Sequence, residues 1–277
     1  MSEGFFGIVI SDREFERFRE LIYRESGIKL RENKKDLLRQ RLNKRIRSLG
    51  LETFSDYYKI VEGDKSRREL TELIDAVSTN VTSFFREIKH FEFLSTRAIP
   101  QTLKRKSNGP FEIRVWSAAC SSGEEPYSLL FTLLEDTEIT QKWKIKLLAT
   151  DISTKVIQKA TLGRYPIIKM NGLPDNLLKK YFDIEGEDYV VKPKIREMIN
   201  FRWFNLITPR FPFKHKFDVI FCRNVMIYFD KPTREELINK FTGALAPGGY
   251  LCIGHSESLA NTNHQLKYIQ PTIYMRP

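Results

Sequence analysis

The stretch Arg114-Val-Trp-Ser-Ala-Ala-Cys-Ser-Ser-Gly-Glu-Glu-Pro-Tyr-Ser128 decides the fold of this chain. A β-favouring run at 111–116 passes into small residues and then into an amphipathic segment that opens with Glu124, Glu125 and Pro126. The pattern predicts a strand, a tight loop and a helix. Such a junction lets backbone approach a ligand closely and directs free helix N–H groups at it. An open parallel α/β sheet binds nucleotide-like molecules at this place, although a simple packing turn stays open as the alternative.

The two acids of this stretch argue against a phosphate ligand. A diphosphate on that helix N-terminus would meet Glu124 and Glu125 at short range and be repelled. S-adenosylmethionine fits better, because it offers ribose hydroxyls, an ammonium and a sulfonium and carries no phosphate. The alternative is that both acids only complement the helix dipole.

Composition and charge narrow the class of protein. The 277 residues suit one large domain, or a small and a larger one. No apolar run approaches the roughly 20 residues of a membrane span, and no signal peptide is recognisable, so we expect a cytoplasmic protein without stable membrane insertion. Cys120, Cys222 and Cys252 lack metal-ligand spacing, which favours buried thiols and no metal. The net charge of +11 calls for an acidic partner.

The first 80 residues predict a small all-helical unit. Ser11 and Glu14 have the spacing of a capping box before an apolar helical pattern that runs to Gly27, and Ser66 and Glu69 repeat that spacing. No strand pattern appears before residue 110. We therefore assign residues 1–85 to an N-terminal helical domain.

One of these helices, at 33–49, is strongly basic. Its exposed faces are expected to carry seven bases against a single acid, Asp36. A docking surface for the substrate and a merely solvated face are both open interpretations. The seven bases are Lys34, Lys35, Arg39, Arg41, Lys44, Arg45 and Arg47.

A polar segment, 78–86, joins the helical unit to the rest of the chain. If it lies across the ligand crevice of the sheet, it places Asn80, Thr82 and Arg86 in the site. The alternative is a helix N-cap cluster in which Phe84 and Phe85 are core residues. A longer helix is expected to follow at 90–104.

After residue 110, β-like runs alternate with helical ones. Asp151 stands just beyond the second strand, where an acid usually accepts from a ribose hydroxyl. Asn205 ends the third strand, and Arg223 and Asn224 follow the fourth. Five such alternations and a terminal hairpin are the layout of class I S-adenosylmethionine-dependent methyltransferases. The expected strands beyond the first are 143–150, 200–207, 217–222, 250–253, 268–270 and 272–275.

Residues 86–277 are thus expected to form a Rossmann-like, mostly parallel α/β domain with an antiparallel terminal hairpin. Regularity fails between 164 and 198, which is too long for an ordinary crossover. We expect an inserted helix and a small antiparallel β subdomain there, with β-like pieces at 189–192 and 194–196.

With these motifs in view, the chain resembles the CheR-type chemotaxis receptor (protein-glutamate) O-methyltransferase family. The resemblance covers nearly the whole chain. It implies transfer of the methyl group of S-adenosylmethionine to glutamate side chains of chemoreceptors (methyl-accepting chemotaxis proteins), which gives γ-methyl esters and S-adenosylhomocysteine in the cytoplasm, at receptor arrays. The stretches that carry it are 78–87, 116–128, 149–151, 221–230 and 254–258.

The resemblance also implies roles for single residues. The choice of Glu125 over Glu124 rests on it alone. Arg86 and Tyr228 are the candidates for holding the substrate carboxylate, with a capped aromatic at a strand end as the alternative for Tyr228. None of the four histidines is needed by this chemistry. The implied cofactor shell is Asn80, Thr82, Arg86, Glu125, Asp151, Asn205, Leu206, Arg223 and Asn224.

Two rival functions remain open from the sequence. A nucleic-acid methyltransferase would suit the positive charge, but enzymes acting on exocyclic amines carry a short acidic or asparagine, proline, proline, aromatic motif where this chain has Arg223-Asn-Val-Met. A non-catalytic regulator that only senses S-adenosylmethionine is the second. We expect a monomer that acts on the cytoplasmic signalling helices of receptors and binds no nucleic acid.

Overall fold

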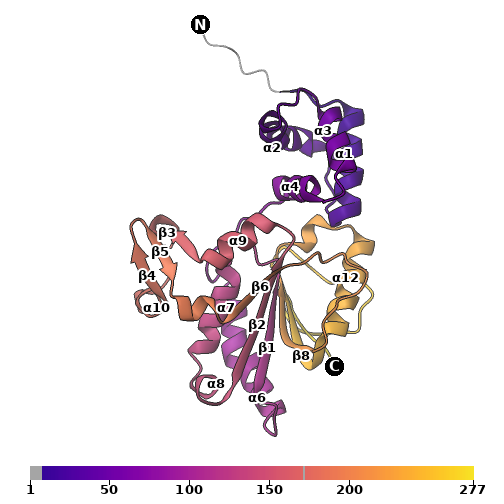
Figure 1. Cartoon of the computed structure of the whole chain (residues 1–277). Coiled ribbons are helices and arrows are strands. Elements are labelled where there is room, and N and C mark those ends of the chain that lie inside the picture. Colours follow the sequence, from indigo (N-terminus) through magenta and orange to yellow (C-terminus); the bar gives the residue numbers. More distant parts are fainter. Residues whose placement is uncertain (1–7, 171) are drawn as a thin grey trace. The chain divides into compact units, whose positions relative to one another are not determined.

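The computed structural model describes residues 8–170 and 172–277, and contacts divide the chain into two compact units (Figure 1). The N-terminal unit comprises the residues up to Thr79 together with Tyr228–Asp230, and the sheet unit comprises Asn80–Ile227 and Lys231–Pro277. The division by contacts thus falls six residues before the predicted start of the second domain at 86. Among the described helices, none has both the length and the apolar composition that crossing a bilayer requires.

The N-terminal unit is all helical in its described part. The capping box predicted for α1 is confirmed, because the Ser11 side chain accepts from the Glu14 amide and the Glu14 carboxylate accepts from the Ser11 amide. Phe18 is fully buried and packs against the rings of Tyr57 and Tyr58 of α3. The helices are α1 (Asp12–Ser26), η1 (Glu32–Lys34), α2 (Lys35–Ser48), α3 (Phe54–Gly63) and α4 (Arg68–Val77).

The second predicted capping box is wrong. Helix α4 begins only after Arg67, whose backbone is left-handed with a φ of 58°, and it has no side-chain N-cap. Asp64 takes the capping part instead, since its carboxylate accepts from the amides of Ser66 and Glu69. Serine and aspartate can both begin such a turn by accepting from backbone amides, and here Asp64 does so in place of Ser66.

The sheet unit contains a seven-stranded sheet in the order β6-β2-β1-β7-β8-β10-β9. The five strands from β6 to β8 are parallel, and β10 runs antiparallel to both β8 and β9, which confirms the predicted terminal hairpin. The strands are β1 (Glu112–Ala118), β2 (Lys144–Asp151), β6 (Ile199–Trp203), β7 (Phe217–Cys222), β8 (Leu245–Ile253), β9 (Lys267–Gln270) and β10 (Ile273–Met275).

Both faces of this sheet are covered, as the apolar strands require. All six residues of β7 are buried, which is typical of a parallel strand with helices on both sides. Figure 1 shows α7 and α12 on opposite sides of the sheet. The helices of this unit outside the insertion are α5 (Lys89–Phe93), η2 (Leu94–Ala98), α6 (Ile99–Arg105), α7 (Glu124–Leu134), α8 (Thr137–Lys142), α9 (Thr154–Leu162), η4 (Met226–Tyr228, shared with the N-terminal unit) and α12 (Lys231–Ala244).

The predicted insertion is a separate three-stranded antiparallel sheet in the order β3-β5-β4. The strand expected at 194–196 is wrong, because Pro193–Arg196 forms one turn of helix, α11, with proline at its start, where a missing N–H costs nothing. The other elements of the insertion are β3 (Arg164–Pro166), η3 (Ile167–Lys169), α10 (Asp175–Tyr181), β4 (Phe182–Glu185) and β5 (Asp188–Val191).

The strand order reverses at β1, and this places the site. Ala118 at the end of β1 pairs with Thr150 of β2 on one side and with Cys222 of β7 on the other. The loops that begin after these three residues therefore leave the same edge of the sheet side by side. A ligand of an open α/β sheet binds at this switch point, outside the carboxyl ends of the strands.

Candidate cofactor and methyl-transfer site

The loop after β1 is held in a tight, strained form. Ala119, Ser121 and Gly123 all have left-handed backbone, with φ of 69°, 50° and 100°. A Cβ on Gly123 would lie 2.8 Å from Tyr165 Oη and 2.9 Å from Ala160 Cβ, so only glycine fits there. Ala119 and Ser121 are strained in this left-handed conformation because they are not glycine. Such strain is common where backbone is shaped around a ligand.

Asp151 ties this loop to the end of β2. Its Oδ2 accepts from the Ser121 amide and its Oδ1 from the Ser153 amide, each at 2.9 Å. The side chain is buried, and the residue lies where an acid accepts from a ribose in folds of this kind.

The two acids at the start of α7 have different surroundings. Ser117 Oγ donates to Glu125 Oε1 at 2.7 Å, and Arg223 Nη1 donates to Glu125 Oε2 at 3.0 Å. Burial raises the pKa of Glu125, against the lowering effect of Arg223. Glu124 accepts from Ser122 Oγ at 2.8 Å, and burial raises its pKa as well. Glu125 is thus the acid connected to Arg223.

The segment before α5 lies against the same loop. Ser121 Oγ donates to the Asn80 carbonyl at 3.2 Å, and Arg86 folds back so that its Nη1 donates to the Val81 carbonyl at 2.9 Å. Phe84 and Phe85 pack against the core at the same time. The alternative interpretation is right about Phe84 and Phe85 but wrong about the helix cap, because α5 follows Ile88 and has no side-chain N-cap. Asn80 lies beside the loop after β1.

Arg223, the first residue after β7, lies among carboxylates. Besides its bond to Glu125, its Nη2 lies 3.0 Å from Glu87 Oε2 and donates to the Arg86 carbonyl. Only 2% of the side chain is exposed. Burial opposes ionisation of Glu87, but the Arg223 guanidinium and the hydrogen bonds from His255 and Asn224 together lower the pKa of Glu87. Asn224 Nδ2 donates to Glu87 Oε1 at 3.3 Å.

Asn205 and Leu206 lie beyond β6, next to the end of β2. The Phe204 amide donates to the Asp151 carbonyl at 2.9 Å, which holds the two strand ends together. Asn205 Oδ1 accepts from the Ile207 amide at 3.2 Å, and Leu206 is buried. Both residues therefore lie beside Asp151, as the position of an adenine-binding edge requires.

Tyr228 lies in η4, four residues after Asn224, and its side chain is half-buried. Contacts group it with the N-terminal unit. Its role in the reaction stays a proposal.

The expectation that all seven bases of the basic helix point to solvent or a partner is wrong for two of them. Arg41 donates to the carbonyls of Val77 and Ser78, and Arg45 forms an ion pair with Glu69. Both side chains join α2 to α4 or its end. Lys34, Lys44 and Arg47 are exposed, while Lys35 and Arg39 are half-buried beside acids of α1 and α2.

Three titratable side chains near Arg223 could also be considered as metal ligands. The ligand atoms of Glu87, His90 and His255 lie within 4.8 Å of one another. The Arg223 guanidinium already neutralises the Glu87 oxygen that faces both histidines. The cluster therefore fits an internal hydrogen-bond network better than a cation site.

Sequence reasoning missed Ser117, Glu87 and Glu257. Glu257 lies after β8, at the same edge of the sheet, and its carboxylate accepts from four backbone amides. Glu257 could have been found by its position just after a parallel strand, the same signal that points to Asp151.

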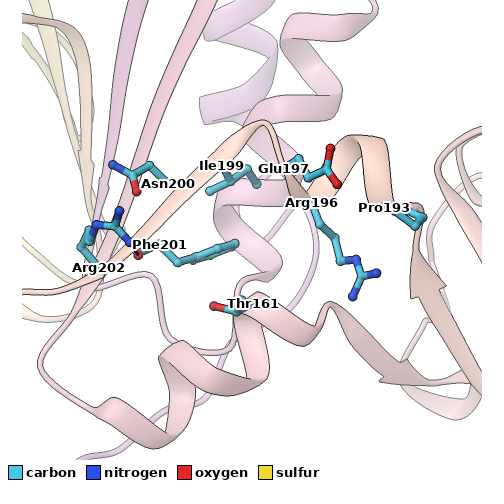
Figure 2. Close-up of a pocket in the computed structure, with 8 residues that line it drawn as sticks. All are labelled: Thr161, Pro193, Arg196, Glu197, Ile199, Asn200, Phe201 and Arg202. Atoms are coloured by element: carbon cyan, nitrogen blue, oxygen red, sulfur yellow. Dashed lines mark hydrogen bonds between the residues drawn. The ribbon is translucent and has the colours of Figure 1, made fainter.

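A surface pocket of about 420 Å³ lies elsewhere on the sheet unit, beside β6, α9 and α11 (Figure 2). It contains none of the predicted site residues. Its lining residues are Thr161, Pro193, Arg196, Glu197, Ile199, Asn200, Phe201 and Arg202.

The residues at the carboxyl edge fit S-adenosylmethionine. Asp151 offers acceptors for ribose hydroxyls, the acids of α7 disfavour phosphate, and the loop of small residues allows close approach of backbone. Together with the strand order and the antiparallel terminal hairpin, this site defines a class I S-adenosylmethionine-dependent methyltransferase.

Comparison with known proteins gives the family. A model described as "CheR methyltransferase, SAM binding domain" matches residues 80–275, and one described as "CheR methyltransferase, all-alpha domain" matches residues 13–78. The chain belongs to the CheR methyltransferase family.

Relatives resemble this chain over nearly its full length. A chemotaxis protein methyltransferase of Borreliella burgdorferi is 43% identical and aligns over 97% of this chain and 96% of its own. One from Salmonella typhimurium is 38% identical over 96% of this chain and 91% of its own. Among solved structures, the glycopeptide N-methyltransferase MtfA overlaps 57% of this chain and 52% of its own, with 15% identity and a TM-score of 0.33.

Proposed function

We propose that this enzyme transfers the methyl group of S-adenosylmethionine to glutamate side-chain carboxylates of chemoreceptors, which forms glutamate γ-methyl esters in chemotactic adaptation. The observation that carries the proposal is the similarity to chemotaxis protein methyltransferases at 43% and 38% identity across both units. The rival functions, nucleic-acid methylation and non-catalytic sensing, have no comparable support.

The chemistry needs alignment more than proton transfer. When bound, S-adenosylmethionine supplies a methyl group on a sulfonium, and transfer leaves the neutral thioether S-adenosylhomocysteine. The substrate glutamate has a reference pKa of about 4.3, so it is already ionised at neutral pH and needs no general base. The protein must therefore align the carboxylate and remove its water, and good alignment alone supplies roughly 7 to 11 kcal/mol.

Arg86 and Tyr228 are the residues to which we assign the substrate carboxylate. Arg86 Nη1 is used by the Val81 carbonyl, but within the described residues no hydrogen bond is made by its Nε or Nη2. Those N–H groups can pair with a carboxylate, which arginine does with two parallel bonds. The Tyr228 hydroxyl would add a third donor.

We assign the cofactor to the carboxyl edge of the sheet. Asp151 faces the ribose, Asn205 and Leu206 the adenine, and Arg223 and Asn224 the methionine end. The burial of Asp151, Leu206 and Arg223 supports the assignment, as do the contacts of Asp151 and Asn224.

Three further residues complete the proposed cofactor shell. Asn80 and Thr82 belong to the segment that lies against the β1 loop, and Glu125 is joined to Arg223. We propose that these residues, together with Arg86, line the cofactor site beside the loop after β1.

We further propose a monomer that acts in the cytoplasm at receptor arrays, docks on receptor signalling helices and binds no nucleic acid. The proposed docking surface consists of the exposed bases Lys34 of η1 and Lys44 and Arg47 of α2. Acidic residues around receptor methylation sites would supply the opposite charge.

The test uses the full-length enzyme with S-adenosylmethionine and two substrates, a cytoplasmic receptor fragment and cellular RNA. Mass spectrometry of the receptor peptides should locate methyl groups on glutamate side chains, and the RNA should stay unmodified. Methyl groups on RNA alone, or cofactor binding without any transfer, would each replace the proposal by one of its rivals.

A further inference from the structure

One buried carboxylate joins two loops of the sheet unit by their backbones. Glu257 Oε1 accepts from the amides of Val225 and Met226 at 2.9 and 2.7 Å. Its Oε2 accepts from the amides of Asn224 and Gly254 at 3.1 and 2.6 Å. Three donors thus come from the turn after β7 and one from the start of the loop after β8.

This arrangement requires a carboxylate. Four N–H donors converge on two oxygens, and an ionised carboxylate is the side chain that offers acceptors only. Within the described residues no salt bridge reaches Glu257. Burial raises the pKa of Glu257, and the hydrogen bonds from the four amides counteract this effect. Charge-assisted bonds of this type are shorter and stronger than neutral ones.

The two loops also touch directly. A Cβ on Gly254 would lie 2.5 Å from Asn224 Nδ2 and 2.8 Å from the Asn224 amide nitrogen, so only glycine fits there. Asn224 itself has left-handed backbone, with a φ of 58°. Asparagine adopts this conformation more readily than most residues other than glycine, and the Glu257 carboxylate accepts from its amide there.

We propose that Glu257 is a positioning residue for cofactor binding. Its carboxylate fixes the backbone of the turn 223–226, which in turn directs the side chains of Arg223 and Asn224 at the cofactor. This inference rests on the proposed assignment of those two residues to the methionine end.

The test is Glu257→Gln, which keeps size and removes one acceptor oxygen. Its amide group would oppose two backbone N–H donors with a donor of its own. We expect the dissociation constant for S-adenosylmethionine to rise by about tenfold or more, whereas the KM for receptor at saturating cofactor stays close to wild type. Hydrogen exchange at the amides of 224–226 should quicken. Glu187→Gln, at an exposed turn, is the matched control and should change none of these.

Asn224→Ala separates failure of this inference from failure of the site assignment. If Asn224→Ala weakens cofactor binding while Glu257→Gln binds like wild type, Glu257 has no positioning role. If Asn224→Ala and Arg223→Gln both bind the cofactor normally, the assignment beneath the inference falls.

A measurement on the wild type keeps the inference testable if Glu257→Gln does not fold. Cofactor binding should slow hydrogen exchange at the amides of 224–226 more than at the amides of the exposed turn at 186–187. Equal or smaller protection at the turn would overturn the inference.

Discussion

At the residue scale, Arg223 balances the charge of the site. Its guanidinium lies between Glu87 and Glu125, and all three side chains are nearly enclosed. Buried charges persist where they are paired and hydrogen-bonded, because an unpaired one costs several kcal/mol. Arg223 is therefore a structural link between the start of α7 and the segment before α5, in addition to its proposed cofactor role. The order of residues along the chain did not reveal this link.

The carboxylates Asp151 and Glu125 give the first prediction. Asp151→Ala and Glu125→Ala should each weaken S-adenosylmethionine binding by about 1 to 3 kcal/mol, because each removes an acceptor from a buried polar site. Calorimetry measures the affinity, and Asp183→Ala on the exposed face of β4 is the control. Unchanged affinity in both variants would refute the cofactor assignment.

Arg86 and Tyr228 give the second prediction. Arg86→Ala and Tyr228→Phe should each lower turnover at saturating cofactor, because the lost contacts belong to the chemical step. For Tyr228→Phe, the loss of turnover should be much larger than the change in cofactor affinity. Single-turnover methylation with each variant measures the step itself. A Tyr228→Phe enzyme with wild-type turnover would show that the hydroxyl takes no part.

At the element scale, the bases in and just before α2 fall into two groups, those bonded within their own unit and those that are exposed. Arg41 and Arg45 satisfy carbonyls and a carboxylate of their own unit, whereas Lys34, Lys44 and Arg47 are exposed. The sequence could not separate these groups, because helical periodicity locates the apolar face but not the partners that other helices offer. Reversing Arg41 or Arg45 would thus damage the unit itself, and only the exposed bases can test docking.

The exposed bases give the third prediction. The variant Lys34→Glu/Lys44→Glu/Arg47→Glu should raise the KM for receptor and leave the KM for S-adenosylmethionine unchanged. High salt should mimic it in the wild type, because the Debye length falls from about 8 Å at physiological ionic strength to about 3 Å at 1 M. Steady-state kinetics across a salt series measures both constants. A variant that methylates receptor normally at every salt concentration would mean that this face is only solvated.

At the scale of the whole molecule, local patterns predicted most of the fold. The alternation of strands and helices after residue 110 led to the correct fold class, and the capping box at Ser11 marked the first helix correctly. The third strand, expected at 200–207, ends at Trp203, so Asn205 lies beyond the strand and not in it. Errors arose where two turn chemistries competed, as at Asp64 and Ser66, or where a β-like piece followed a proline, as at 194–196.

The residues of the candidate site were likewise only partly predictable from the sequence. Residues that directly follow a strand, such as Asp151 and Arg223, could be placed at the carboxyl edge from the sequence. Glu87 could not, because its partners Arg223 and Asn224 are distant in the chain. Glu257 also follows a strand, but its partners are backbone amides, which no residue pattern reveals. The contacts of Glu87 with Asn224 span 137 positions.

A buried histidine gives the fourth prediction, on stability. Burial lowers the pKa of His90 from 6.5 to about 4, helped by the nearby Arg223. Between these values the unfolded chain binds a proton that the folded chain does not, so acid favours unfolding. His90 should therefore reduce the free energy of unfolding by up to about 3 kcal/mol as the pH falls from 6.5 to 4.

Urea unfolding across this pH range measures the effect. His90→Gln should lose less stability on acidification than the wild type, and His215→Gln, at an exposed position, should behave like the wild type. Parallel pH slopes for all three proteins would contradict the burial of a neutral His90.

The most direct test of the central claim is the fate of a labelled methyl group. The full-length enzyme is incubated with methyl-tritiated S-adenosylmethionine and a receptor cytoplasmic fragment, and the isolated receptor is then treated with alkali. Glutamate γ-methyl esters hydrolyse under these conditions and release volatile tritiated methanol, and a receptor with its methylated glutamates replaced by alanine should release none. Label that stays on the receptor after alkali, or that never reaches it, would contradict the account.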